Sequence, residues 1–282
     1  MSRNTWRRFV SNVMGALCAA SVLVALIPLG FILFYLVVKG AGSLNLAFFT
    51  QTPKPTGELG GGMANSIVGS LTVCGLGALF AVPIGVMSGI FIVERGGRFA
   101  EVVRFAADTL NGVPSIVIGV FAYAIVVLPM KQFSALAGGA ALGVMMIPLI
   151  ARTTEELLRL VPNALREGAL ALGATRARAV FTVVLPAALP GIVTGIVLAL
   201  ARIAGETAPL LFTALNNAYW SSSLTQPIST LTVQVFTYAL SAYDDLHRQA
   251  WAGALVLVAL VLSCSLAARF ATRKLSRMSV GH

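Results

Sequence analysis

The chain has 282 residues, of which 57% are hydrophobic and only 11% are charged. Soluble domains carry about 25% charged residues, so the composition excludes a soluble enzyme built around one large core. The formal net charge is +10, but the basic residues gather in short segments between apolar runs, and we expect no nucleic-acid partner.

Six uncharged runs are each long enough for a membrane-spanning helix, which needs about 20 apolar residues. They cover residues 9–38, 63–93, 109–130, 132–151, 179–201 and 249–268. The first run exceeds the ~7–15 apolar residues of a signal peptide, so we expect a retained helix. Residues 207–243 are also uncharged, but their centre, NNAYWSSSLTQP, is polar, and we expect an interfacial or re-entrant element there. The sequence therefore predicts an all-α polytopic membrane protein with about six transmembrane helices.

Small residues recur within these runs. Glycines four residues apart lie on one helix face and allow close helix packing; the pairs are Gly85/Gly89, Gly139/Gly143 and Gly191/Gly195. The three cysteines also lie inside predicted spans and have no metal or disulfide spacing, so we expect them to pack as small apolar residues.

Positive charge is distributed unevenly between the two sides that six crossings define. Of the 20 Lys and Arg residues, one side holds only Lys39, Lys54, Lys131 and Arg248, and Arg202 lies within a span. The others lie on the side of the two termini. Because cytoplasmic segments are enriched in Lys and Arg, we expect both termini in the cytoplasm.

The largest cytoplasmic segment covers residues 152–185. Pro162 should end the helix that leaves the fourth span, and Asn163 can cap a new one. Gly173 is placed to end that second helix, and residues 174–181 can form another. Two short helices at the cytoplasmic face would form a surface on which a soluble partner protein could dock.

Several kinds of catalytic site are missing from the sequence. It contains no G-x-x-x-x-G-K-[ST] loop for ATP, and its only histidines, His247 and His282, are too scattered for a metal site. We find no serine nucleophile motif and no pair of carboxylates within one span. The sequence therefore argues against an enzyme.

Arg202 and Glu206 are the main chemical signal inside a span, in the stretch ARIAGETAPLLFTALNN. On a continuous helix they would lie on one face, one turn apart. An arginine near the membrane centre costs roughly 2.5–3.5 kcal/mol, so it should face the protein interior or water. Two interpretations remain open: a structural ion pair at a helix bend, for which Gly205 and Pro209 provide the break, or an anion pathway lined by Arg202.

A second candidate is NGVPSIVIG, in which Asn111 and Ser115 flank Pro114. Proline suits the first turn of a helix, and a buried helix start offers N–H groups to an anion. Simple capping of a membrane helix is the alternative.

The cytoplasmic segment EGALALGATRARAVFTVVLP resembles the EAA loop of ABC-importer permeases. Five positions match at the family's spacing: Glu167, Ala169, Gly173, Leu185 and Pro186. Gly168 replaces an alanine of the family pattern and Val183 replaces an isoleucine. The resemblance implies a type I importer permease fold whose coupling helix docks on a separate ATPase subunit, which would explain the absence of a nucleotide site.

Three further stretches resemble the PstA-type phosphate-importer permeases: GGGMANSIVGSL, NGVPSIVIGVFAY and RIAGETAPLLFTALNN. The resemblance implies a bacterial inner-membrane protein that carries inorganic phosphate. The implied partners are a PstC-like sister permease, a PstB-like ATPase dimer that binds ATP and Mg, a PstS-like extracytoplasmic phosphate-binding protein and membrane lipid. It also places Arg202 and Glu206 near the translocation path and favours the anion interpretation.

The expected organisation has three regions. Residues 1–62 hold the first span and an outer loop, residues 63–270 form the core permease with the coupling loop at about 163–186, and residues 271–282 form a cytoplasmic tail. The alternatives in function are an ion-coupled anion transporter or channel, in which Glu206 would be a proton site, and an importer of another oxyanion. The EAA loop argues against the ion-coupled transporter or channel, which has no use for a docking segment.

Overall fold

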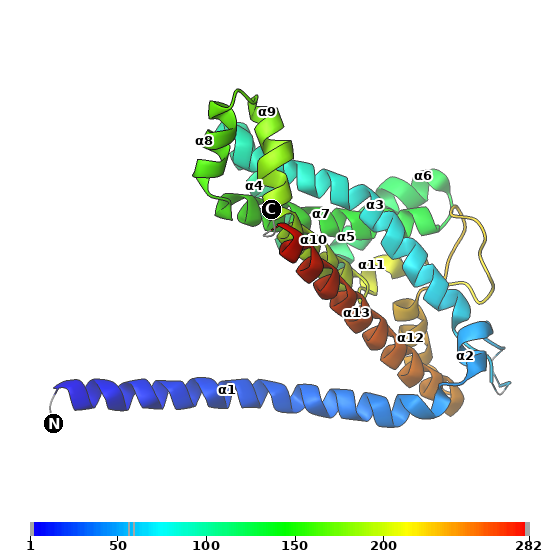
Figure 1. Ribbon diagram of the computed structural model, residues 1–282. Coiled ribbons are helices and arrows are strands. Elements are labelled where there is room, and N and C mark those ends of the chain that lie inside the picture. Colours follow the sequence, from blue (N-terminus) through cyan, green and yellow to red (C-terminus); the bar gives the residue numbers. More distant parts are fainter. Residues whose placement is uncertain (1–2, 56, 59, 280–282) are drawn as a thin grey trace.

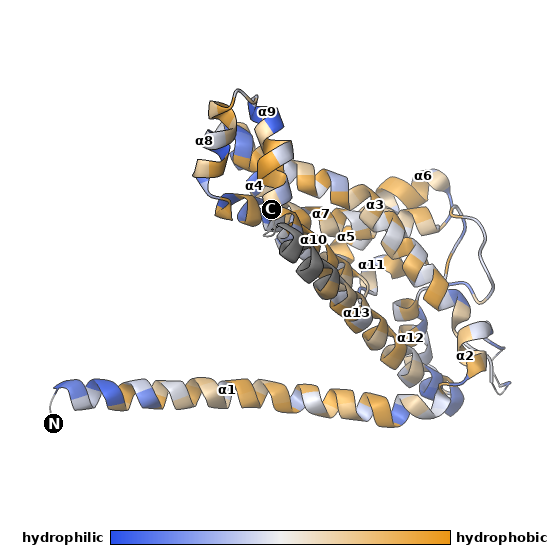
Figure 2. Cartoon of the chain, in the orientation of Figure 1, coloured by the Kyte–Doolittle hydropathy of each residue, from blue (hydrophilic) through white to orange (hydrophobic). Residues whose placement is uncertain are grey.

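The computed structural model describes residues 3–55, 57–58 and 60–279, and this part of the chain contains helices and loops but no β-strand. Five helices are long and apolar enough to cross a membrane: Arg3–Ser43, Ala64–Arg95, Ala135–Leu160, Arg176–Ile203 and Asp244–Ala267. A bent pair, Gly97–Gly112 with Ser115–Met130, supplies a sixth crossing if it is counted as one span. Figure 2 shows apolar residues along most of these helices. The predicted all-α membrane fold is confirmed.

The first helix, α1 (Arg3–Gly40), stands away from the helices that form the body of the protein (Figure 1). The C-terminal end of α1 meets the start of α13 (Asp244–Ser279), where the rings of Tyr35 and Trp251 lie 5.3 Å apart edge to face. Gly40 lies so close to the main chain of Trp251 that a Cβ atom would be 2.7 Å from the carbonyl oxygen. Almost every other side chain of α1 is exposed, so most of its apolar surface has no partner within the described chain.

The centre of the body is formed by α3 (Ala64–Arg95), α7 (Ala135–Leu160) and α10 (Leu185–Ile203). The predicted glycine pairs lie at their contacts. A Cβ atom on Gly85 or Gly89 of α3 would come within 2.7 Å of Ile150 or Thr154 of α7, and one on Gly195 of α10 within 2.3 Å of Thr153. The close helix packing expected from these glycines is confirmed, because only a hydrogen fits at these positions.

The third predicted span, residues 109–130, contains a helix break at Pro114. The helix α4 (Gly97–Gly112) ends near the start of this range, and α5 (Ser115–Ala122) begins after a bend of 105°. Val113 is extended because the ring of Pro114 disfavours a helical residue before it, and Pro114 has no N–H for a continued helix. The span then continues through a π-helical turn, η2 (Tyr123–Val127), and α6 (Leu128–Met130).

The separate short helix expected at residues 174–181 is wrong. Residues from Arg176 to Ile203 form one helix: α9 (Arg176–Ala179), a π-helical turn η3 (Val180–Val184) and α10. The π turn comes just before Pro186, as η2 comes just before Pro129, and it changes the hydrogen-bond register where a proline ring would meet the carbonyl four residues earlier. The coupling segment therefore connects rigidly to the fifth span.

The helix before it, α8 (Asn163–Ala171), begins without a side-chain cap, so the capping role expected for Asn163 is wrong. Asn163 instead occupies the first helical position, after Pro162. The expected end at Gly173 is confirmed: Gly173 has φ +85°, its N–H donates to Leu170, and the N–H of Ala174 donates to Ala169. This is the hydrogen-bond pattern that a glycine with positive φ forms after a helix.

The remaining elements are short: η1 (Ala41–Ser43), α2 (Leu46–Thr50), α11 (Ala208–Leu211) and α12 (Leu231–Ala239). Of these, η1, α2 and α12 lie toward the end of the body away from α8, whereas α11 packs against α5 (Figure 1). Within residues 207–243, where we expect an interfacial or re-entrant element, α12 has only nine residues and is too short to span a membrane. Helix α13 continues through residue 279, so most of the segment 271–282 is helical, and residues 280–282 lie outside the described chain.

Candidate functional site

The first group of candidate residues lies where the bent span breaks. Helix α4 runs antiparallel to α7, because Arg104 pairs with Glu155 and Asp108 pairs with Arg152. Continuing along α4 brings Asn111 beside Leu149, near the middle of α7. The break at Val113 and Pro114 therefore lies level with the middle of α7, and Asn111 and Pro114 are exposed there. Discontinuous spans of this kind place helix ends and free backbone groups at the middle of a membrane.

Neither Asn111 nor Ser115 caps α5, which begins after Pro114 without a side-chain hydrogen bond. The capping alternative is therefore wrong. The N–H groups of Val117 and Ile118 both donate to the Pro114 carbonyl. Those of Ser115 and Ile116 have no hydrogen-bond acceptor in the described residues, so the first turn of α5 keeps two donors for another group.

Arg202 belongs to the last turn of α10. This helix runs antiparallel to α7, with Gly191 against Leu157 and Gly195 against Thr153. Two turns further, Arg202 is level with the middle of α7. Its exposed side chain lines a shallow pocket whose other walls are Leu110, Asn111, Val113, Ile118, Met145, Leu149 and Ile203. The structure thus brings Arg202 and Asn111 together at the break of the bent span.

Glu206 does not lie on the same helix as Arg202. Helix α10 ends at Ile203, because Gly205 weakens a further turn and the ring of Pro209 would meet the carbonyl of Gly205 in a continued helix. In the described part of the chain, neither side chain makes an ion pair or a side-chain hydrogen bond. The interpretation of the two residues as a structural pair is therefore wrong within this chain, and so is the expectation of one shared helix face. The break expected near Gly205 is confirmed.

The second group of candidate residues forms the cytoplasmic coupling segment. Glu167 and Gly168 are exposed on α8, and Ala169 is half-buried. Leu172, directly after α8, is 90% exposed. Leu185, the first residue of α10, packs against the cluster of Leu158, Val184 and Ala188, and the exposed Pro186 follows it. The segment has the accessible, partly apolar surface that a docking helix needs.

A charge cluster at the base of this segment was not foreseen. Glu155 is 2% exposed and accepts from Arg104, Arg152 and Arg159 at 2.8–2.9 Å. A neighbouring bond joins Arg166 of α8 to Glu94 of α3 at 3.1 Å. The signal in the sequence was Arg152, Glu155 and Arg159 at helical spacing, which we counted only as part of the cytoplasmic charge excess. The cluster ties α4 to α7 directly next to α8.

Known proteins resemble this chain over most of its length. Residues 81–278 match the family described as binding-protein-dependent transport system inner membrane component. The phosphate transport system permease protein PstA of Yersinia pestis is 44% identical over 96% of this chain and 94% of its own length. The PstA protein of Haemophilus influenzae is 43% identical over 94% of each.

Solved structures show the same fold at low identity. A chain of a bacterial alginate ABC transporter, in complex with an alginate-bound periplasmic protein, matches with a TM-score of 0.68 at 15% identity, over 95% of this chain and 97% of that one. A chain of the MetNI methionine ABC transporter in an inward-facing conformation matches with a TM-score of 0.64 at 22% identity, over 76% of this chain and 95% of that one.

Proposed function

The chain belongs to the family of binding-protein-dependent transport system inner membrane components, and we propose that it is the PstA-type permease subunit of an ATP-driven phosphate importer. Relatives named for phosphate transport cover nearly its whole length. The observation that carries the proposal at the site is Arg202, whose guanidinium has no ionic partner in the described chain and lines a pocket level with the middle of α7.

Arg202 suits an oxyanion because of its charge and shape. Phosphate is negative at neutral pH, and an apolar path would reject it. A guanidinium offers several N–H donors in a planar fork that matches two oxygens of an oxyanion. Asn111 adds an amide on the same pocket, and the first turn of α5 adds N–H donors close by. In this proposal Ser115 and Glu206 border the path beyond the pocket.

The coupling segment connects this pocket to a separate ATPase. We propose that α8, with Glu167, Gly168, Ala169 and Gly173, docks on a PstB-like ATPase dimer, which binds ATP and Mg. A movement of α8 would reach α10 through the continuous helix from Arg176, and would reach α4 through the Glu155 cluster. Both routes end at the pocket of Arg202 and Asn111, so closure of the ATPase dimer can change access to it.

Two other surfaces fit the remaining partners. The exposed apolar faces of α1 suit lipid and a PstC-like sister permease, which would complete the path. A PstS-like binding protein would deliver phosphate at the end of the body opposite α8. In this arrangement α8 and both termini are cytoplasmic.

The experiment that tests the proposal is uptake of labelled phosphate into cells that carry the whole transporter, with the native chain or Arg202→Gln. We expect uptake to fall by about 100-fold or more, since a charge that holds the transported ion cannot be replaced by water in a dehydrated path. Arg98→Gln is the matched control, because Arg98 is an exposed arginine without an ion pair in the described residues. Membranes from all three strains are checked for equal amounts of assembled complex.

Three outcomes separate the proposal from its alternatives. Normal uptake by Arg202→Gln would remove Arg202 from the path. Uptake that follows a proton gradient and continues without ATP would favour an ion-coupled transporter with Glu206 as its proton site. Inhibition of phosphate uptake by equimolar sulfate or molybdate would favour an importer of another oxyanion.

A further inference from the structure

The stretch GGGMANSIVGSL places four small or polar residues on one face of α3. They are Asn65, Ser66, Gly69 and Ser70, whose spacing makes them neighbours on the helix surface. Asn65, Ser66 and Ser70 are each at most 7% exposed. Burying a polar side chain is costly unless it is hydrogen-bonded, so this face of α3 needs polar partners on a neighbouring element.

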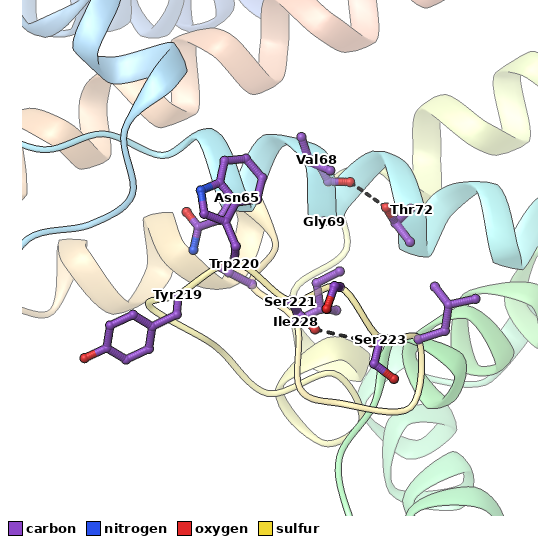
Figure 3. Close-up of a pocket in the computed structure, with 12 residues that line it drawn as sticks. Asn65, Val68, Gly69, Thr72, Tyr219, Trp220, Ser221, Ser223 and Ile228 are labelled. Atoms are coloured by element: carbon purple, nitrogen blue, oxygen red, sulfur yellow. Dashed lines mark hydrogen bonds between the residues drawn. The ribbon is translucent and has the colours of Figure 1, made fainter.

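The loop between α11 and α12, residues 212–230, lies against this face. Asn65 donates from Nδ2 to the main-chain oxygen of Asn217 at 2.8 Å. Figure 3 shows Asn65 and Gly69 of α3 next to this loop, which carries Trp220. Because Gly69 has no side chain, the main chain of the loop can lie directly on the helix.

Two serine hydroxyls hold the start of α12 to the same face. The Oγ atoms of Ser66 and Ser229 lie 2.7 Å apart, within hydrogen-bond distance, and Ser70 Oγ accepts from the N–H of Leu231 at 2.7 Å. The first N–H groups of a helix have no acceptor within that helix, and Ser70 supplies one from α3. The position at which α12 begins is therefore fixed by α3.

Thr232, in the first turn of α12, connects this helix to the break after α10. Its Oγ1 donates to the main-chain oxygen of Glu206 at 3.0 Å. In a continued helix this oxygen would accept from the N–H of Leu210, but that N–H donates to the oxygen of Thr207 at 3.1 Å. A carbonyl without a donor is costly inside a membrane, and Thr232 provides the donor from a different element.

The break that Thr232 holds is the end of the helix that carries Arg202. Two tight-turn hydrogen bonds, from Gly205 to Arg202 at 3.3 Å and from Glu206 to Ile203 at 3.0 Å, make the segment between them compact. A shift of the Glu206 carbonyl would therefore move the end of α10 and the guanidinium of Arg202 relative to its pocket. Thr232 is only 5% exposed, so it acts through the chain and not by contact with the transported ion.

We propose that Thr232 is a positioning residue for phosphate passage. Its hydrogen bond to Glu206, with α12 held on α3 by Ser66 and Ser70, fixes the place of Arg202 in the path. The inference rests on the proposed function for the identity of the ion and for the role of Arg202. The alternative is a hydrogen bond that only stabilises the fold, whose loss would lower the melting temperature and leave the phosphate imported per ATP unchanged.

The test removes single hydroxyl groups from the whole transporter and measures phosphate imported per ATP hydrolysed. Thr232→Val keeps the branched side chain but loses the donor, whereas Thr232→Ser keeps the donor. Thr237→Val is the matched control, because Thr237 lies on the same helix and its hydroxyl donates to Val233, one turn earlier. We expect about a tenfold fall for Thr232→Val, since small misplacements of aligned groups have large effects on rates. Recovery is expected for Thr232→Ser and no change for Thr237→Val, at equal amounts of assembled complex.

Amide hydrogen exchange of the purified complex in lipid nanodiscs gives a second measurement that needs no phosphate. We expect faster exchange in Thr232→Val, confined to residues 203–211. Unchanged exchange in this segment would overturn the proposal, as would faster exchange with normal import per ATP. A lower melting temperature with normal import per ATP would assign Thr232 to fold stability alone and also overturn it. A native complex that imports no phosphate would refute the proposed function, and the exchange would still decide whether Thr232 holds the break.

Discussion

At the scale of single residues, Gly69 shows how closely the α11–α12 loop is fitted to α3. A Cβ atom at Gly69 would lie 1.9 Å from the main-chain oxygen of Ser229, which cannot move independently of the loop. We expect Gly69→Ala to destabilise the complex by about 1–3 kcal/mol, a typical cost of overpacking, visible as a lower melting temperature in detergent. Gly75→Ala is the control, because nothing lies within 4 Å of the Cβ position there. Equal melting temperatures for the two variants would contradict this fit.

The candidate residues also show what a single sequence can and cannot predict. Arg202 was found because a charge in an apolar run is exceptional wherever the chain folds. The pairing of Arg202 with Glu206 was wrong, because it assumed that one helix continues through both residues. Gly205 and Pro209 end the helix before Glu206. Asn111 and Arg202 share a pocket because α4 and α10 both pack against α7. No local pattern contains this information.

At the scale of helices, the Glu155 cluster predicts that removing Glu155 destabilises the complex far more than removing its neighbour Glu156. Glu155 is buried among three arginines, whereas Glu156 is exposed without an ion pair in the described chain. Removing Glu155 leaves arginines from α4 and α7 facing one another, and breaking a hydrogen-bonded buried ion pair costs about 3–5 kcal/mol. We expect less, about 2 kcal/mol, because the arginines are one-third to one-half exposed and can turn to water. Melting of the purified Glu155→Ala and Glu156→Ala complexes measures the difference, and similar curves would show that the cluster does not hold α4 to α7.

The sequence predicted the long helices and the end of α8 correctly, but it did not predict the chain's course at individual prolines. The long spans follow from hydropathy, and the end of α8 follows from a glycine that can adopt positive φ. The sequence does not show how strongly each proline acts: Pro114 bends its span by 105°, whereas Pro186 lies inside a continuous helix after a π-helical turn. Whether a proline breaks a helix depends on the groups that neighbouring helices offer to the freed carbonyls. Those neighbours are known only once the fold is known.

At the scale of the whole molecule, function depends on two ends with different properties. One end carries α8, the exposed Leu172 and the Glu155 cluster. The other carries the loop with Tyr219 and Trp220, and the pocket of Arg202 and Asn111 lies between them. An importer needs this order, because the binding protein and the ATPase act from opposite sides of the membrane. Reversed insertion would expose the coupling helix to the wrong compartment.

The orientation is therefore the property of the whole molecule on which the proposed function depends. We expect a cysteine introduced as Gln226→Cys, in the exposed loop, to react with a membrane-impermeant thiol reagent in intact cells. Ala177→Cys, exposed beside the coupling segment, should react only after the membrane is permeabilised. The native Cys18, Cys74 and Cys264 are first replaced by alanine, so that the introduced thiol is the only target. We expect α8 on the cytoplasmic side because that side of the protein carries the excess of Lys and Arg. Labelling of Ala177→Cys in intact cells would place α8 outside and refute its docking on an ATPase.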